Sequence, residues 1–295
     1  MAFNWQTFRI RTITSLIFVG VMLTGLLWNQ WSFFILFSII HFGCWWEYLK
    51  LMEKIHTTTF HPYIKLGLMV MGYALMLWFC GPAYQVNGYS IKENISLPVS
   101  AAGFALLLTG IFQKNKISFK NFGAALFGLL YISLSWGLMM DLYKSNDFRF
   151  SGTRYITGAN FIPLVIIAGL WINDTFAYLI GSLFGKHPLT KISPKKTWEG
   201  TIGGIILCIA LMFFLWNSVV YSIHDNNINA VVGIIATVAA ITGVFGDLFE
   251  SKLKRIAGIK DTGNIMPGHG GFLDRFDSLL MATPFVWLYV QLCIK

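Results

Sequence analysis

The chain has 295 residues, of which 56% are hydrophobic and only 12% are charged. Its mean hydropathy is +0.63. An ordinary soluble domain carries about 25% charged residues, so this composition excludes a soluble globular protein of this size. The net charge of +9 is basic, but the basic residues are dispersed and form no nucleic-acid-binding motif, so we expect no nucleic-acid partner.

Nine apolar runs are predicted to cross the membrane as helices, because a span needs about 20 mostly apolar residues. The first run follows Arg9 and Arg11 and has no small-residue cleavage site, so we expect a retained span rather than a cleaved signal peptide. The second and fourth runs are short. The predicted fold is therefore an all-α polytopic membrane protein. In chain order, the predicted spans are Ile10–Trp28, Trp31–Trp46, Ile64–Gly81, Leu97–Phe112, Asn121–Met140, Phe161–Leu183, Thr201–Tyr221, Asn229–Phe249 and Ser278–Ile294.

The distribution of Lys and Arg predicts the orientation. With the N-terminus in the cytoplasm, 17 of the 22 basic residues face the cytoplasm, where positive charge accumulates beside anionic lipid headgroups. The C-terminus then lies outside. We predict one membrane domain, residues 1–295, with a five-span region at 1–140 and a catalytic region at 161–295. The catalytic region carries two cytoplasmic loops at 184–200 and 250–277, whereas the outer loop Asp141–Asn160 has no distinguishing motif.

Asp174 lies inside the sixth predicted span, beside Asn173 and Thr175. An ionisable residue within a span is costly and usually faces a cavity or a partner. The three residues therefore indicate a polar pocket, with a hydrogen-bonded structural Asp as the alternative. Near the second span, His41 and Glu47 are interpreted as structural or interfacial residues.

The loop before the seventh span combines lysines with hydroxyls, in the order Ser193-Pro194-Lys195-Lys196-Thr197-Trp198-Glu199-Gly200. Free N–H groups at a helix N-terminus and adjacent lysines favour polyphosphate binding. A simple positive anchor on the cytoplasmic face would also explain the lysines. Glu199 and Gly200 fit a built site better than an anchor.

Four of the eight Asp residues lie between Gly246 and Asp277, interleaved with basic residues and glycines. Mg²⁺ is held by a few carboxylates together with water and substrate phosphate, Lys and Arg neutralise phosphate oxygens, and glycines let backbone N–H groups approach an anion. The pattern therefore suits a metal-dependent phosphate reaction, and a basic loop bound to lipid is the alternative. His269 has no companion at metal-ligand spacing, so a phosphate contact is favoured over zinc.

The run from Ser251 to Asp277, SKLKRIAGIKDTGNIMPGHGGFLDRFD, resembles the defining motif of the phosphatidate cytidylyltransferases. The segments Asp174–Tyr178 and Ser193–Gly200 also look like elements of that family, in the expected order. The resemblance covers the C-terminal half, and nothing is carried onto the first five spans. It implies that CTP and phosphatidic acid react to give CDP-diacylglycerol and pyrophosphate.

The resemblance also implies residue roles. As metal ligands it indicates Asp247 and Asp274 first, then Asp261 and Asp277. As catalytic residues it indicates Asp247, Asp274, Lys260 and Asp261. The predicted substrate-binding residues are Asp174, Ser193, Lys195, Lys196, Thr197, Glu199, Lys254, Arg255, His269, Gly270, Gly271 and Arg275.

The resemblance implies Mg²⁺, a second cation such as K⁺ and a homodimer. Membrane lipids are further expected partners. We also expect a bacterial-type inner membrane, with the site on the cytoplasmic side that the charge distribution predicts. Two other functions fit the residues. A CTP-dependent lipid-alcohol kinase would release CDP rather than pyrophosphate. An ion-coupled transporter would use Asp174 and Asp247 at the midplane, but the inverted repeats that such a fold favours are not evident.

Overall fold

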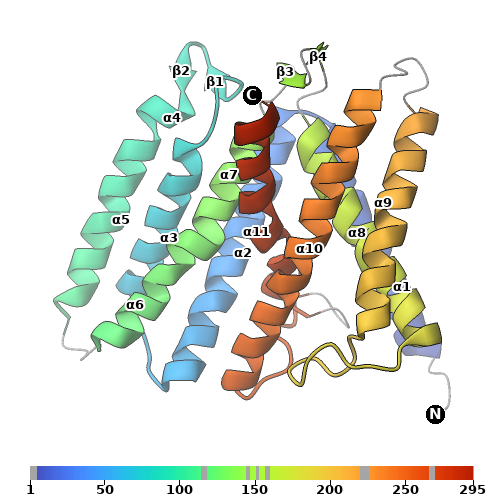
Figure 1. Cartoon of the computed structure of the whole chain (residues 1–295). Coiled ribbons are helices and arrows are strands. Elements are labelled where there is room, and N and C mark those ends of the chain that lie inside the picture. The colour runs from blue at the N-terminus through green and yellow to red at the C-terminus, as the bar shows by residue number, and fades with distance from the viewer. Residues whose placement is uncertain are drawn as a thin grey trace. The chain divides into compact units, whose positions relative to one another are not determined.

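The structure of the chain is a computed structural model that describes residues 5–113, 118–143, 147–150, 153–156, 160–219, 226–265 and 270–294. Helices form most of the described chain (Figure 1), which confirms the all-α class. Two short antiparallel hairpins are added. One pairs β1 (Gln85–Val86) with β2 (Tyr89–Ser90), and the other pairs β3 (Asp147–Phe150) with β4 (Thr153–Ile156), inside the outer loop that showed no motif.

The helices keep the order of the predicted spans. The helical elements are α1 (Trp5–Leu27), α2 (Gln30–His56), α3 (Pro62–Trp78), α4 (Ile91–Asn94), α5 (Ser96–Ile111), α6 (Phe119–Gly128), the π-helix η1 (Leu129–Leu134), α7 (Ser135–Tyr143), α8 (Phe161–Phe184), α9 (Trp198–Val219), α10 (Asn226–Ile256), α11 (Leu273–Tyr289) and the π-helix η2 (Val290–Ile294).

Seven helical segments of the described chain are long and apolar enough to cross a membrane, as expected for an integral membrane protein. Two shorter apolar helices, Thr12–Leu27 and Pro62–Trp78, coincide with the first and third predicted spans. Each predicted span thus has an apolar helix at its place, while the count of nine spans and the orientation of the termini stay predictions. The second and fourth apolar runs are short and left the ends of these spans open. The helical segments found there are longer than the runs and cover Gln30–His56 and Ile91–Ile111, the latter comprising α4 and α5.

Helix α2 is longer than its apolar run because both of its ends are capped. The Asn29 side chain accepts hydrogen bonds from the N–H groups of Trp31 and Ser32, each at 2.9 Å, and the Ser32 hydroxyl accepts from Asn29 N–H at 3.0 Å. This capping box satisfies donors that the first helical turn leaves free. The helix ends where Thr57 adopts a left-handed φ of 48°. Glu47 and the charged residues after it therefore stay helical.

The chain divides into two compact units. Unit 1 comprises Met1–Asp141 and Leu253–Phe276, and unit 2 comprises Leu142–Lys252 and Asp277–Lys295. Helices α10 and α11 contribute residues to both. The prediction of one membrane domain over residues 1–295 stays a prediction.

Small residues allow close helix packing in unit 1. A Cβ placed on Gly67 of α3 or on Gly103 of α5 would meet the backbone of the facing helix, so the two helices approach closely there. A buried polar contact fixes α2 against η1. The Trp45 indole donates to the Ser133 hydroxyl at 2.8 Å, and His41 Nε2 lies 3.1 Å from the same oxygen. His41 thus has the structural environment that we expected.

Unit 2 uses the same device. A Cβ on Gly200 or Gly204 of α9 would collide with Ala177 of α8, and a Cβ on Gly246 of α10 would collide with the backbone oxygen of Asp277 on α11. The close approach of α8 and α9 fixes both ends of the loop that joins them.

Candidate functional site

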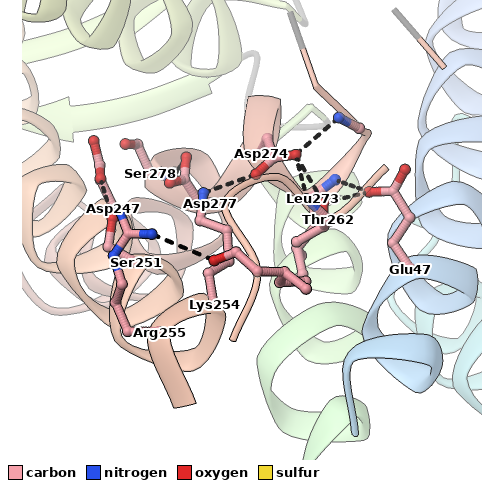
Figure 2. A network of polar contacts seen from close by, with 12 residues as sticks. Glu47, Asp247, Ser251, Lys254, Arg255, Thr262, Leu273, Asp274, Asp277 and Ser278 are labelled. Carbon is pink, nitrogen blue, oxygen red and sulfur yellow. Dashed lines mark hydrogen bonds and ion pairs between the residues drawn. The ribbon is translucent and has the colours of Figure 1, made fainter. Parts of the chain in front are cut away.

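Among the described residues, two groups of polar side chains contain a carboxylate–lysine ion pair from the predicted site, one group in each unit. The first group, here called the Asp274 cluster, lies in unit 1 and contains Glu47, Lys254, Thr262, Gly271, Leu273 and Asp274 (Figure 2). Helix α2 supplies the first of these residues and the end of α10 the second. The other four come from residues 262–272, here called the glycine-rich loop, and from the start of α11.

Asp274 lies at the centre of this cluster. Its Oδ1 accepts a charge-assisted hydrogen bond from Lys254 Nζ at 2.7 Å. Its Oδ2 accepts from the backbone N–H groups of Gly271 at 2.8 Å and Thr262 at 2.9 Å, and lies 2.9 Å from the Thr262 hydroxyl. The side chain is only 8% exposed. Asp274 therefore organises the glycine-rich loop and neutralises a half-buried ammonium.

Local geometry explains why this loop turns back on itself. Helix α10 ends at Ile256, and Gly258 just beyond it has a φ of +68°, with hydrogen bonds from Gly258 N–H to Arg255 O and from Ile259 N–H to Lys254 O. Gly270 has a φ of +85°, beside the Asp274 carboxylate. Such left-handed conformations favour glycine. Asp274 also stands in the first turn of α11, where the helix dipole stabilises negative charge.

Glu47, like Thr262 and Leu273, is a cluster member that the sequence pattern did not assign to a site. It lies on α2, is only 2% exposed, and its Oε2 accepts hydrogen bonds from Leu273 N–H and the Thr262 hydroxyl, both at 2.8 Å. The available signal was an acidic residue next to a strongly apolar run, which is usually functional. The interpretation as a structural or interfacial residue overlooked contacts with residues more than 200 positions away.

The second group, the Asp247 cluster, lies in unit 2 and contains Lys196, Asp247 and Ser251. Lys196 Nζ forms an ion pair with Asp247 Oδ2, and the Ser251 hydroxyl donates to Asp247 Oδ1 at 3.2 Å. Both charged side chains are about 30% exposed (28% and 30%). The ion pair joins the α8–α9 loop to α10, and each charge stays accessible to an incoming ligand.

The α8–α9 loop is fastened by its own residues. Glu199 accepts from the N–H groups of Lys186 and His187, and its Oε1 lies 2.6 Å from His187 Nδ1. The Thr197 hydroxyl accepts from Gly200 N–H at 3.1 Å, which caps the start of α9. Glu199 and Thr197, both predicted to bind substrate, therefore shape the loop in this structure.

The other predicted residues lie outside the two clusters. Six of them are exposed: Asp174, Lys195, Arg255, Lys260, Asp261 and Arg275. Ser193 is half-buried, and Gly270 lies in the glycine-rich loop. Asp277 is buried on α11, where its Oδ1 accepts from Ser278 N–H. His269 lies outside the described residues. Gly271, predicted to contact substrate, uses its N–H for Asp274.

The carboxylates differ in how well they fit a metal ion. No three His, Cys, Asp or Glu side chains of the described ranges lie close enough together to hold one. Mg²⁺, however, commonly takes only one or two carboxylates and completes its shell with water and phosphate. Asp247 fits this better, because its side chain is 30% exposed and can take a further ligand beside the Lys196 ammonium. Asp274 fits less well, because its oxygens already accept from Lys254, Gly271 and Thr262.

The fold and the two clusters define an integral membrane protein with paired carboxylate and ammonium groups on α10, on α11 and in the α8–α9 loop. The chain belongs to the cytidylyltransferase family, whose model matches residues 9–293. The family suggested by the motif is thus confirmed. The match also covers the first five spans, onto which the sequence comparison carried nothing.

Curated relatives agree with this family. The chain is 32% identical over 285 residues to a phosphatidate cytidylyltransferase of Staphylococcus aureus, which covers 94% of this chain and 97% of the relative. It is 37% identical over 201 residues to the phosphatidate cytidylyltransferase of Staphylococcus haemolyticus, and the matched region covers 66% of this chain and 69% of the relative. It is 34% identical over 220 residues to the chloroplastic phosphatidate cytidylyltransferase 4 of Arabidopsis thaliana, 68% of this chain. The chain spans about half (54%) of the length of that plant protein.

Proposed function

We propose that this chain transfers CMP from CTP to phosphatidic acid, giving CDP-diacylglycerol and pyrophosphate. A phosphate oxygen of the lipid attacks the α-phosphorus of CTP, the bond to the β-phosphate breaks, and pyrophosphate leaves. The observation that carries the proposal is the similarity to the Staphylococcus aureus enzyme, which extends over nearly the full length of both chains.

The two clusters support this chemistry. Phosphoryl transfer depends on positioning and on charge neutralisation more than on a protein nucleophile. Lys196 and Lys254 are held by Asp247 and Asp274 respectively, and an ammonium held by a carboxylate is oriented before an anion arrives. Exposed basic side chains add positive charge near these residues in the sequence, and such charge favours the binding of triphosphate and lipid phosphate. They are Lys195, Arg255, Lys260 and Arg275.

We propose Mg²⁺ as the cofactor, with Asp247 as its first protein ligand and Asp261 and Asp277 as further candidates. When bound, Mg²⁺ supplies charge neutralisation at the phosphate oxygens. Asp274 is assigned instead to ordering the glycine-rich loop and Lys254. The second cation such as K⁺ and the homodimer stay predictions.

A product assay with two labelled forms of CTP tests the function. Purified protein, phosphatidic acid and Mg²⁺ are incubated with CTP labelled at either the α- or the γ-phosphorus. We expect the α-label to enter the lipid and the γ-label to appear in pyrophosphate. In a parallel reaction with a polyprenol in place of phosphatidic acid, transfer of the γ-label to the alcohol would indicate a kinase. Absence of label in any lipid of either reaction would contradict both enzymes and leave transport as the alternative.

We also propose a bacterial-type inner membrane with both polar loops facing the cytoplasm. Single cysteines replace Lys191, Lys252 or Lys92, all exposed, in a cysteine-free background. In intact cells, an impermeant thiol reagent should label Lys92→Cys and leave Lys191→Cys and Lys252→Cys unmodified. After the cells are opened, all three should react, which controls for accessibility. Labelling of the two loop positions in intact cells would reverse the orientation and separate the loops from cytoplasmic CTP.

A further inference from the structure

The buried carboxylate of Glu47 joins the two ends of the glycine-rich loop. Its Oε2 accepts from the hydroxyl of Thr262, where the loop begins, and from the N–H of Leu273, where α11 begins. Both distances are 2.8 Å. Hydrogen bonds to a charged group are stronger than neutral ones, so one side chain of α2 fixes a loop that lies more than 200 residues further along the chain.

The glycines of this loop leave the space that Glu47 occupies. A Cβ on Gly271 would collide with both carboxylate oxygens and Cδ of Glu47, which are its three nearest heavy atoms. A Cβ on Gly263 would collide with Oε1 and Cδ of the same side chain. The Glu47 carboxylate thus explains why both positions are glycine, and no bound anionic substrate is needed to explain it.

Glu47 is also coupled to the centre of the cluster. The Thr262 hydroxyl lies within hydrogen-bond distance of both Glu47 Oε2 and Asp274 Oδ2, and it has a single proton to donate (Figure 2). Gly271, whose Cα faces Glu47, donates its N–H to Asp274. A movement of Glu47 would therefore displace the groups that hold Asp274 and, through Asp274, the ammonium of Lys254.

We infer that Glu47 is a positioning residue for the reaction: it contacts no substrate and holds the loop that orients Asp274 and Lys254. The expected effect of Glu47 on turnover rests on the proposed function. The ordering of the loop by Glu47 rests on the geometry alone. A purely structural anchor is the competing reading, so the test must separate ordering and turnover from stability.

The first test compares Glu47→Gln with Glu47→Ala. The Gln carbonyl oxygen can accept from both Leu273 and Thr262, whereas Ala leaves the Leu273 N–H buried without an acceptor, which is costly. We expect Glu47→Ala to lower kcat by roughly tenfold to a hundredfold, with a smaller change in KM for CTP. Glu47→Gln should recover most of the turnover. Hydrogen–deuterium exchange at residues 259–265 and 270–273 should accelerate in Glu47→Ala and much less in Glu47→Gln.

The second test is a double-mutant cycle with Gly271→Ala. Alone, this substitution should strongly reduce turnover, because the new Cβ meets the Glu47 carboxylate. In the Glu47→Ala background it should cost little more, because the colliding atoms are gone. Gly123→Ala on α6, where a Cβ would meet nothing within 4 Å, is the matched control and should leave turnover and exchange unchanged.

Three outcomes would overturn the inference: parental exchange of the loop in Glu47→Ala, additive losses in the cycle, or a lower melting temperature with unchanged kcat. The exchange measurement needs no substrate. It therefore decides whether Glu47 orders the loop even if the labelled-CTP assay disproves the proposed chemistry.

Discussion

Asp274→Asn is expected to reduce turnover by roughly a hundredfold or more, since several hydrogen bonds to a charged group are lost at once, each worth about 1.5–3 kcal/mol. The carboxylate accepts from the Lys254 ammonium and two backbone N–H groups, and its Oδ2 lies 2.9 Å from the Thr262 hydroxyl. An amide offers one oxygen in place of two, and its NH₂ group would face a donor. Steady-state kinetics and the melting temperature of the variant measure the effect, and we expect both turnover and stability to fall.

Glu53→Gln is a suitable control for Asp274→Asn. The Glu53 carboxylate also pairs with a lysine, Lys65 at 2.7 Å, and also accepts from a backbone N–H, that of Phe60 at 2.7 Å. It lies near the end of α2 in the same unit but outside the Asp274 cluster. We expect this variant to be modestly less stable than the parent protein and to keep the parental kcat. Near-parental turnover of Asp274→Asn, or an equal loss of turnover in the control, would contradict a special role for Asp274.

The helices were largely predictable because a long run of apolar residues identifies a membrane-spanning segment. Ends were harder to place. The second span appeared to stop at Trp46 because charged residues follow, yet α2 continues to His56. Lys50 contributes to this continuation, with its ammonium 4.7 Å from the centre of the Trp46 ring. Hydropathy reports where a helix is apolar, whereas capping at Asn29 and Thr57 determines where it begins and ends.

The site was predictable in its residue types and less so in its partners. The motif placed Lys254 and Asp274 among functional residues, and the structure pairs them. It gave no reason to connect Glu47 with Thr262, because sequence spacing carries no information on contacts between distant segments. Gly271 was interpreted as an anion contact because glycines often expose N–H groups. In the structure that N–H donates to Asp274 instead.

Lys196 and Asp247, the two charged residues of the Asp247 cluster, are expected to have different roles. If Lys196 and Asp247 formed only an ion pair, removing either partner would have the same consequence. With Asp247 as a Mg²⁺ ligand and Lys196 as a triphosphate contact, the two variants must differ. Asp247→Asn should abolish measurable turnover, whereas Lys196→Gln should raise KM for CTP about tenfold to a hundredfold, the value of one charge-assisted contact, and change KM for phosphatidic acid less.

A thermal shift measured without substrate shows the same separation. Mg²⁺ should raise the melting temperature of the parent protein, because a ligand stabilises the state that binds it. The shift should shrink in Asp247→Asn. It should persist or grow in Lys196→Gln, because the ammonium that faces the Asp247 carboxylate is removed and no longer competes with the metal for it. Equal Mg²⁺ responses in both variants, together with equal kinetic losses, would reduce the pair to a structural ion pair and move the metal assignment to Asp261 and Asp277.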